Sequence, residues 1–278
     1  MPRLDSTAAW AAARRMVAAN RDMLVAIGGV FFLLPGLIGV LVLPALPLTR
    51  DMDQQAMADA VMKFYASAGP ILILLALPTL VGYLTLLVIL LDRDRPPVGR
   101  AIVQAVRLLP GYLVVQVATA MALSFAWVTL IGLLALVLPA VVAMVVSIVV
   151  MLYPLTRIML IGPEMAAFRL RNPLRAIQAG LARTRGQVVA LLLFFGPAMA
   201  LFAVVYMLAM MAVGSVIALA WPASSPDQAI AGAQRMIAEA IGGTLFAVGY
   251  TYFCAMAAAT WRQLGPIQGS DPDSPFAI

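Results

Sequence analysis

Long apolar runs separated by short charged segments dominate the chain. Each run reaches or exceeds the roughly 20 apolar residues that a helix needs to cross the hydrocarbon core of a membrane. The runs do not show the alternation of apolar and polar residues that is typical of strands. The expected fold class is therefore all-α, a polytopic transmembrane helix bundle. The runs predict about six spans, at residues 23–48, 68–91, 109–133, 139–161, 187–221 and 235–261.

Two of these runs are too long for one upright span. Residues 108–161 would measure about 80 Å as a single helix, so the chain must fold back near residues 134–139. Residues 187–221 would measure about 52 Å, against a hydrocarbon core of about 30 Å. Two interpretations of this second run stay open: one tilted span, bent at Pro197, or a run broken into two parts.

Short amphipathic segments precede the first, third and fifth spans. In the clearest segment, residues 170–185, leucine and isoleucine recur at helical spacing and arginines occupy another face. We expect these segments to be short cytoplasmic helices lying at the membrane interface.

The amphipathic segments also indicate an internal repeat. Each third of the chain has the order of a surface helix followed by a two-span hairpin, a pattern known from repeated membrane folds. The predicted repeats cover residues 6–91, 97–161 and 172–261 of one transmembrane domain, residues 1–278. Residues 262–278 are expected to form a short disordered tail.

Composition supports a membrane protein. Hydrophobic residues make up 64% of the 278 residues and charged residues only 11%, with a mean hydropathy of +1.01. Soluble domains carry about 25% charged residues, so a water-soluble fold of this size lacks the polar surface that it would need. The surplus apolar surface must therefore face lipid.

The basic residues predict the orientation. If both termini and the segments at 92–108 and 157–186 face the cytoplasm, only Arg50, Lys63 and Arg235 of the 18 basic residues face away. This distribution is typical of a bacterial inner-membrane protein with an even number of spans. The net charge of +6 is then explained by anionic lipid headgroups at the cytoplasmic face, and no nucleic-acid partner is expected.

The inventory of reactive side chains does not favour an enzyme. The chain has no histidine and one cysteine, Cys254, and it lacks a nucleotide-binding motif. Histidine-based nucleophilic catalysis and histidine-ligated metals are therefore excluded. We expect no cofactor, no metal and no catalytic residue, and we interpret Cys254 as a small packing residue.

Two sets of polar residues are candidates for a functional site. Basic residues of the predicted surface helices are candidate lipid-headgroup contacts: Arg100, Arg107, Arg171, Arg175, Arg183 and Arg185. Polar residues within or at the ends of spans are candidates for an internal cavity: Arg157, Glu164, Arg235, Glu239, Tyr250 and Tyr252. Arg235 and Glu239, four residues apart, are expected to form an interfacial ion pair.

Several segments resemble a known membrane domain. They are PLRAIQAGLARTRG at residues 173–186, the Tyr153-Pro154 pair with IGPE at 161–164, and YFCAMAAATWRQL at 252–264. Together they resemble the membrane domain of glycerophosphoryl diester phosphodiesterases and the related YciC-like inner-membrane proteins. The resemblance covers about the last two-thirds of the chain and implies a topology. It implies no activity, because only a short tail follows Trp261 where some members carry the catalytic domain.

Three functions are compatible with this sequence. The first is a non-enzymatic inner-membrane protein that binds lipid, a membrane-protein partner or a second copy of itself. The alternative is a transporter or permease subunit for an amphipathic solute, which predicts a cavity near Pro154, Pro197, Tyr250 and Tyr252. A membrane-embedded enzyme would need carboxylates or hydroxyls that converge at headgroup depth.

Overall fold

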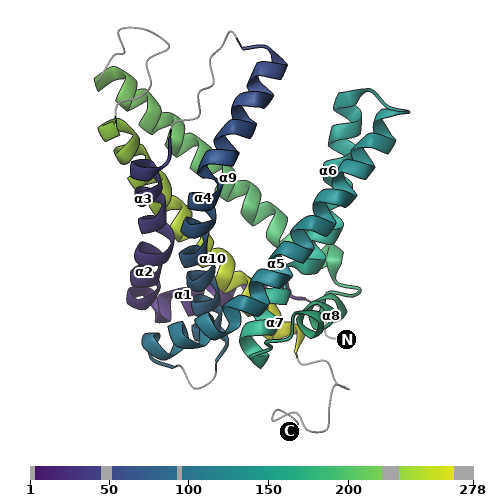
Figure 1. Cartoon of the computed structure of the whole chain (residues 1–278). Helices are drawn as coiled ribbons and strands as arrows, with labels where there is room; N and C mark the ends of the chain where they lie inside the picture. The colour runs from purple at the N-terminus through teal and green to yellow at the C-terminus, as the bar shows by residue number, and fades with distance from the viewer. Residues whose placement is uncertain (1–3, 45–51, 93–95, 221–231, 266–278) are drawn as a thin grey trace.

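A computed structural model describes residues 4–44, 52–92, 96–220 and 232–265, and every element in these ranges is a helix (Figure 1). Within them, six stretches are long and apolar enough to cross a membrane, which confirms the predicted multi-span helical bundle. The six stretches are Arg21–Val42, Gln54–Leu91, Val98–Ala135, Ala140–Phe168, Val188–Ala220 and Gln234–Leu264.

The chain begins with a surface helix that packs across the end of the bundle. Helix α1 (Ser6–Ala19) starts at Asp5, whose carboxylate accepts hydrogen bonds from the backbone N–H groups of Thr7 and Ala8. It lies against the last helix, α10 (Gly232–Leu264), and the Asp5 N–H donates to the Gln263 side chain at 3.2 Å. The first and last described elements therefore meet at one end of the molecule.

The first span contains a local widening of the helix. It consists of α2 (Arg21–Gly28), a π-helical turn η1 (Gly29–Leu33) and α3 (Leu34–Val42). Pro35 lies in the first turn of α3, directly after the π-turn. Proline lacks the backbone N–H group that an α-helix interior requires. The wider π-helical turn directly before Pro35 is consistent with this missing hydrogen-bond donor.

The middle third of the chain forms a hairpin with one difference from the sequence prediction. Helices α5 (Val98–Ala135) and α6 (Ala140–Ile158) meet at a short turn, as predicted for residues 134–139. Residues 98–108 do not form a separate surface helix, because α5 continues through Pro110 without a break. The most apolar 18-residue stretch of α5 has no buried residue, so it is available to lipid.

The last third has the predicted order of surface helix, span and span. After α7 (Ile161–Phe168), Asn172 caps α8 (Pro173–Arg183) by accepting hydrogen bonds from Leu174 N–H and Arg175 N–H. Helix α9 (Val188–Ala220) is unbroken and strongly tilted in Figure 1, so the tilted span is the correct interpretation of this run. The three-fold repeat stays a prediction.

The tightly packed core lies at the end of the bundle that carries α1, α7 and α8 (Figure 1). There the last ten residues of α4 (Gln54–Leu91) and residues 254–260 of α10 are buried. Cys254 is fully buried, as expected of a packing residue. Close approach of α8 to α7 requires Gly180, because an added Cβ would lie 3.0 Å from the Ile161 Cα atom.

The C-terminal prediction needs one correction. Residues 262–264 continue α10 and do not begin a tail. The remainder of the predicted disordered segment, residues 266–278, lies outside the described residues.

Candidate functional site

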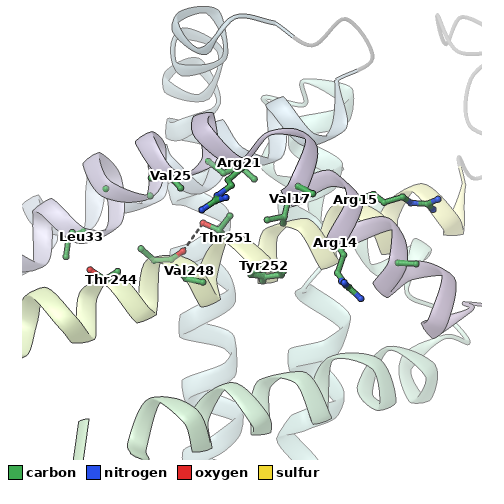
Figure 2. Close-up of a pocket in the computed structure, with 16 residues that line it drawn as sticks. Arg14, Arg15, Val17, Arg21, Val25, Leu33, Thr244, Val248, Thr251 and Tyr252 are labelled. Atoms are coloured by element: carbon green, nitrogen blue, oxygen red, sulfur yellow. Dashed lines mark hydrogen bonds between the residues drawn. The ribbon is translucent and has the colours of Figure 1, made fainter. Parts of the chain in front are cut away.

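A pocket of about 890 Å³ lies between α1, α2 and η1 on one side and α10 on the other (Figure 2). Pockets that bind drug-sized ligands typically have volumes of about 300–1,000 Å³. The pocket is therefore large enough to hold a substantial part of a small amphipathic molecule.

One end of this pocket is strongly basic. Arg14, Arg15 and Arg21 line it, and no aspartate or glutamate does. In Figure 2, Arg21 points toward Thr251 of α10, while Arg14 and Arg15 mark the α1 end of the pocket. None of the three forms an ion pair with a carboxylate in the described part of the chain. We call these three residues the arginine end of the pocket.

Away from the arginine end the pocket is apolar, and it runs along the helices. Its walls continue along α2 from Leu24 to Leu33 and along α10 from Tyr252 back to Thr244. Arg21 and Leu33 are separated by about 18 Å of helix, close to half of a hydrocarbon core of about 30 Å. The pocket therefore has about the depth of one membrane leaflet.

The pocket also opens sideways. Val25 and Val248 contribute to its walls, yet they are 67% and 53% exposed. Both residues belong to helices that qualify as membrane spans, so the opening lies between two candidate spans.

Small residues create the space. Gly28, Gly29 and Ala247 line the pocket between the spans, and a Cβ atom added at Gly29 would meet nothing within 4 Å. Thr251 presents little polarity to it, because its hydroxyl donates to the Ala247 carbonyl at 2.8 Å. At the arginine end, the Tyr252 ring stacks on Trp10 of α1 with a centroid separation of 6.3 Å.

A smaller cavity of about 200 Å³ lies deeper in the bundle, between α4, α5, α7 and α10. Three tyrosines meet there: the Tyr83 ring lies 5.6 Å from that of Tyr112 and 5.9 Å from that of Tyr250, between centroids. Gln116 and Thr119 add further polar atoms to its walls. This cavity is more polar than the large pocket, but it is small.

A buried ion pair joins the helices near the pocket's end of the bundle. The Arg183 side chain donates to the Glu164 carboxylate and to the Gly265 carbonyl, and both charged side chains are at most 3% exposed. The Arg183 guanidinium also lies 4.7 Å from the centroid of the Trp261 ring. Arg183 is therefore not a headgroup contact, which corrects the sequence-based prediction. It fixes α8 to α7 and to the end of α10.

The structure distributes the other predicted site residues over several places. The remaining candidate headgroup contacts are exposed: Arg100, Arg107, Arg171, Arg175 and Arg185. Tyr252 lines the large pocket and Tyr250 the smaller cavity, whereas Arg157 is partly buried and lines neither.

The prediction of an ion pair between Arg235 and Glu239 is wrong. No ion pair within 4.0 Å joins them, although both belong to the described residues. The Glu239 carboxylate lies against Gly36 of α3, because that glycine leaves room for it. Helical spacing placed the two residues near one another, and the packing of α3 directs the carboxylate elsewhere.

Sequence reasoning missed the arginine end of the pocket, although a signal was present. Arg21, Val25 and Gly28 follow one another at steps of four and three residues, which places them along one face of α2. This periodicity puts one basic residue and an apolar wall in a single stripe, whereas Arg14 and Arg15 belong to the separate helix α1. The sequence alone does not show that α10 lies opposite this stripe.

The described residues contain no group of three histidine, cysteine, aspartate or glutamate side chains positioned to hold a metal ion. Comparison with known proteins adds no functional assignment: no protein-family model, no curated protein and no solved structure matches the chain. The functional argument therefore rests on the geometry of the pocket.

The Glu164–Arg183 pair leads to a prediction about stability. Glu164→Gln leaves the Arg183 guanidinium buried without its counter-charge, and removing one partner of such a pair typically costs about 3–5 kcal/mol. We expect a loss of this order in the free energy of unfolding, measured by denaturant titration in detergent.

The matched control is Arg169→Gln. Arg169 and Asp92 form an ion pair at 3.2 Å, with side chains 64% and 15% exposed. Exposed pairs contribute only about 0–1 kcal/mol, so this change should have little effect. Equal effects of the two substitutions would show that burial of the Glu164–Arg183 pair is not what makes it important.

Proposed function

We propose that the chain is a non-enzymatic, integral inner-membrane protein that binds membrane lipid in the pocket between α1–α2 and α10. The observation that carries this proposal is the combination of a basic end, an apolar length and a lateral opening in one cavity. A lipid has the same order of parts: a polar headgroup followed by apolar chains. A water-soluble solute would make no favourable contact with the apolar length and would not need an opening toward lipid.

The arrangement of the arginines supports an orientation with this end of the bundle in the cytoplasm. Helices α1 and α8 lie at one end of the molecule in Figure 1; the exposed Arg14 and Arg175 belong to them, and the exposed Arg171 directly precedes α8. Basic residues accumulate on the cytoplasmic side of bacterial inner-membrane proteins and attract anionic headgroups. Both termini would then face the cytoplasm.

Lipid binding in the pocket can be tested by a substitution that fills the pocket with a side chain. Gly29→Phe introduces a ring into the open space beside Gly29 without a clash at its Cβ atom. We expect the variant to lose most of the lipid that copurifies with the wild-type protein, because ring and acyl chain occupy the same volume. Native mass spectrometry after mild detergent extraction measures the number of lipids that remain bound.

The control is Gly132→Phe in α5. Gly132 also has nothing within 4 Å of an added Cβ, but it is exposed and does not line the pocket. This variant should retain lipid as the wild type does. Equal lipid retention in all three proteins would contradict the proposed function.

The orientation is testable by cysteine labelling. In a Cys254→Ala background, Gly99→Cys and Arg171→Cys place a thiol at exposed positions at the α1–α8 end, and Gln55→Cys places one at the start of α4. A membrane-impermeant maleimide applied to intact cells should label residue 55 alone, and all three should react after lysis. Labelling of residues 99 and 171 in intact cells would overturn the topology.

The tyrosine-lined cavity supports a second candidate function, transport of an amphipathic solute. Its hydroxyl groups lie inside the helix bundle, where a carrier would bind its solute. A transporter predicts solute uptake into proteoliposomes that falls when Tyr250→Phe removes a hydroxyl from the cavity. The lipid-binding function predicts no uptake above that of protein-free liposomes, so this measurement separates the two.

A further inference from the structure

We infer that the pocket selects a phospholipid with a net negative headgroup, binding its phosphate at the arginine end and one of its acyl chains along α2 and α10. This inference rests on the proposed function and makes it more specific. It names the chemical class of the ligand and assigns Arg14, Arg15 and Arg21 to its recognition.

The charge of the pocket lining requires an anion. Arg14, Arg15 and Arg21 all line one end, although their side chains point in different directions (Figure 2), and the lining contains no carboxylate that would neutralise them. Guanidinium groups bind phosphate oxygens through paired hydrogen bonds, which makes arginine the preferred side chain for this recognition. The ammonium group of a zwitterionic headgroup would find three positive charges and no carboxylate at this end. A net anionic lipid is therefore the better electrostatic partner.

The shape of the pocket requires a chain attached to that anion. The walls continue past the arginines for about one leaflet and become apolar at once, through Leu24, Val25 and Leu33. A free phosphate or a detached headgroup would leave this apolar length without a partner. The lateral opening at Val25 and Val248 allows the rest of the lipid to stay in the bilayer.

Other arginines at the same end of the bundle provide a contrast. Arg175 lies in α8 and Arg171 and Arg185 lie just beyond its two ends; they are exposed, as the pocket arginines are, but none of them lines the pocket. They can attract anionic lipid in general, but they do not border the apolar length of this pocket. Selectivity for a bound lipid should therefore depend on the pocket arginines and not on the α8 arginines.

The test compares two triple variants that lower the net charge equally. One is Arg14→Gln/Arg15→Gln/Arg21→Gln, and the other is Arg171→Gln/Arg175→Gln/Arg185→Gln. Each purified protein is titrated with phosphatidylglycerol and with phosphatidylcholine of identical chains, and binding is read by native mass spectrometry. We expect the wild type and the α8 variant to prefer phosphatidylglycerol by about tenfold or more, and the pocket variant to lose this preference.

A single substitution keeps the test decisive if the triple pocket variant does not fold. Arg21→Gln leaves both arginines of α1 in place, and it should weaken the preference for phosphatidylglycerol by several-fold. Excess glycerol phosphate, which carries the anion without the chains, should not displace bound phosphatidylglycerol. Displacement by this excess would overturn the role of the acyl chain.

Failure of this inference is distinguishable from failure of the proposed function. Equal binding of both lipids, abolished by Gly29→Phe, would overturn the selectivity and leave lipid binding in the pocket intact. Loss of the preference in the α8 variant would also overturn the inference, because it would place the selectivity outside the pocket. Lipid binding that Gly29→Phe does not reduce would overturn both.

Discussion

The cost of placing a guanidinium group in hydrocarbon constrains the whole molecule. An arginine at the centre of a membrane helix costs about 2.5–3.5 kcal/mol on insertion scales, so arginines collect where water and headgroups can reach them. Here this requirement holds α1, α8 and the start of α5 at one end of the bundle (Figure 1). The apolar helices extend from that end, and their backbone polar groups are satisfied within each helix because lipid offers no partner.

Arg183 is an exception, because its charge is stabilised by protein groups and not by water or headgroups. Its side chain is buried, and its charge is compensated by the Glu164 carboxylate, the Gly265 carbonyl and the face of Trp261. These partners come from α7, from the end of α10 and from the residue that follows it. A charge that cannot reach water thus joins three segments at the interface, and the core is best packed in the same region.

The sequence predicts the spans well, because length and apolar composition alone decide whether a helix crosses a membrane. It also predicts the turn before Ala140, where α6 begins. It does not predict which arginine is buried, because Glu164 reaches Arg183 only after α7 and α8 have packed together. The pocket likewise cannot be predicted from the sequence of any one segment. It exists because Gly28 and Gly29 of one span face Ala247 and Thr251 of another that lies more than 200 residues away.

The same constraint explains why the pocket has a direction. Arginine can line it only at the interface, so Arg14 and Arg21 lie at the mouth, and the walls deeper in the leaflet are apolar. An apolar space that opens to lipid does not stay empty, because empty space forfeits the dispersion contacts that a chain would make. If the pocket binds lipid as proposed, acyl chains fill the groove whatever their headgroup. The arginines would then determine which headgroup is retained, since the apolar walls contact all chains alike.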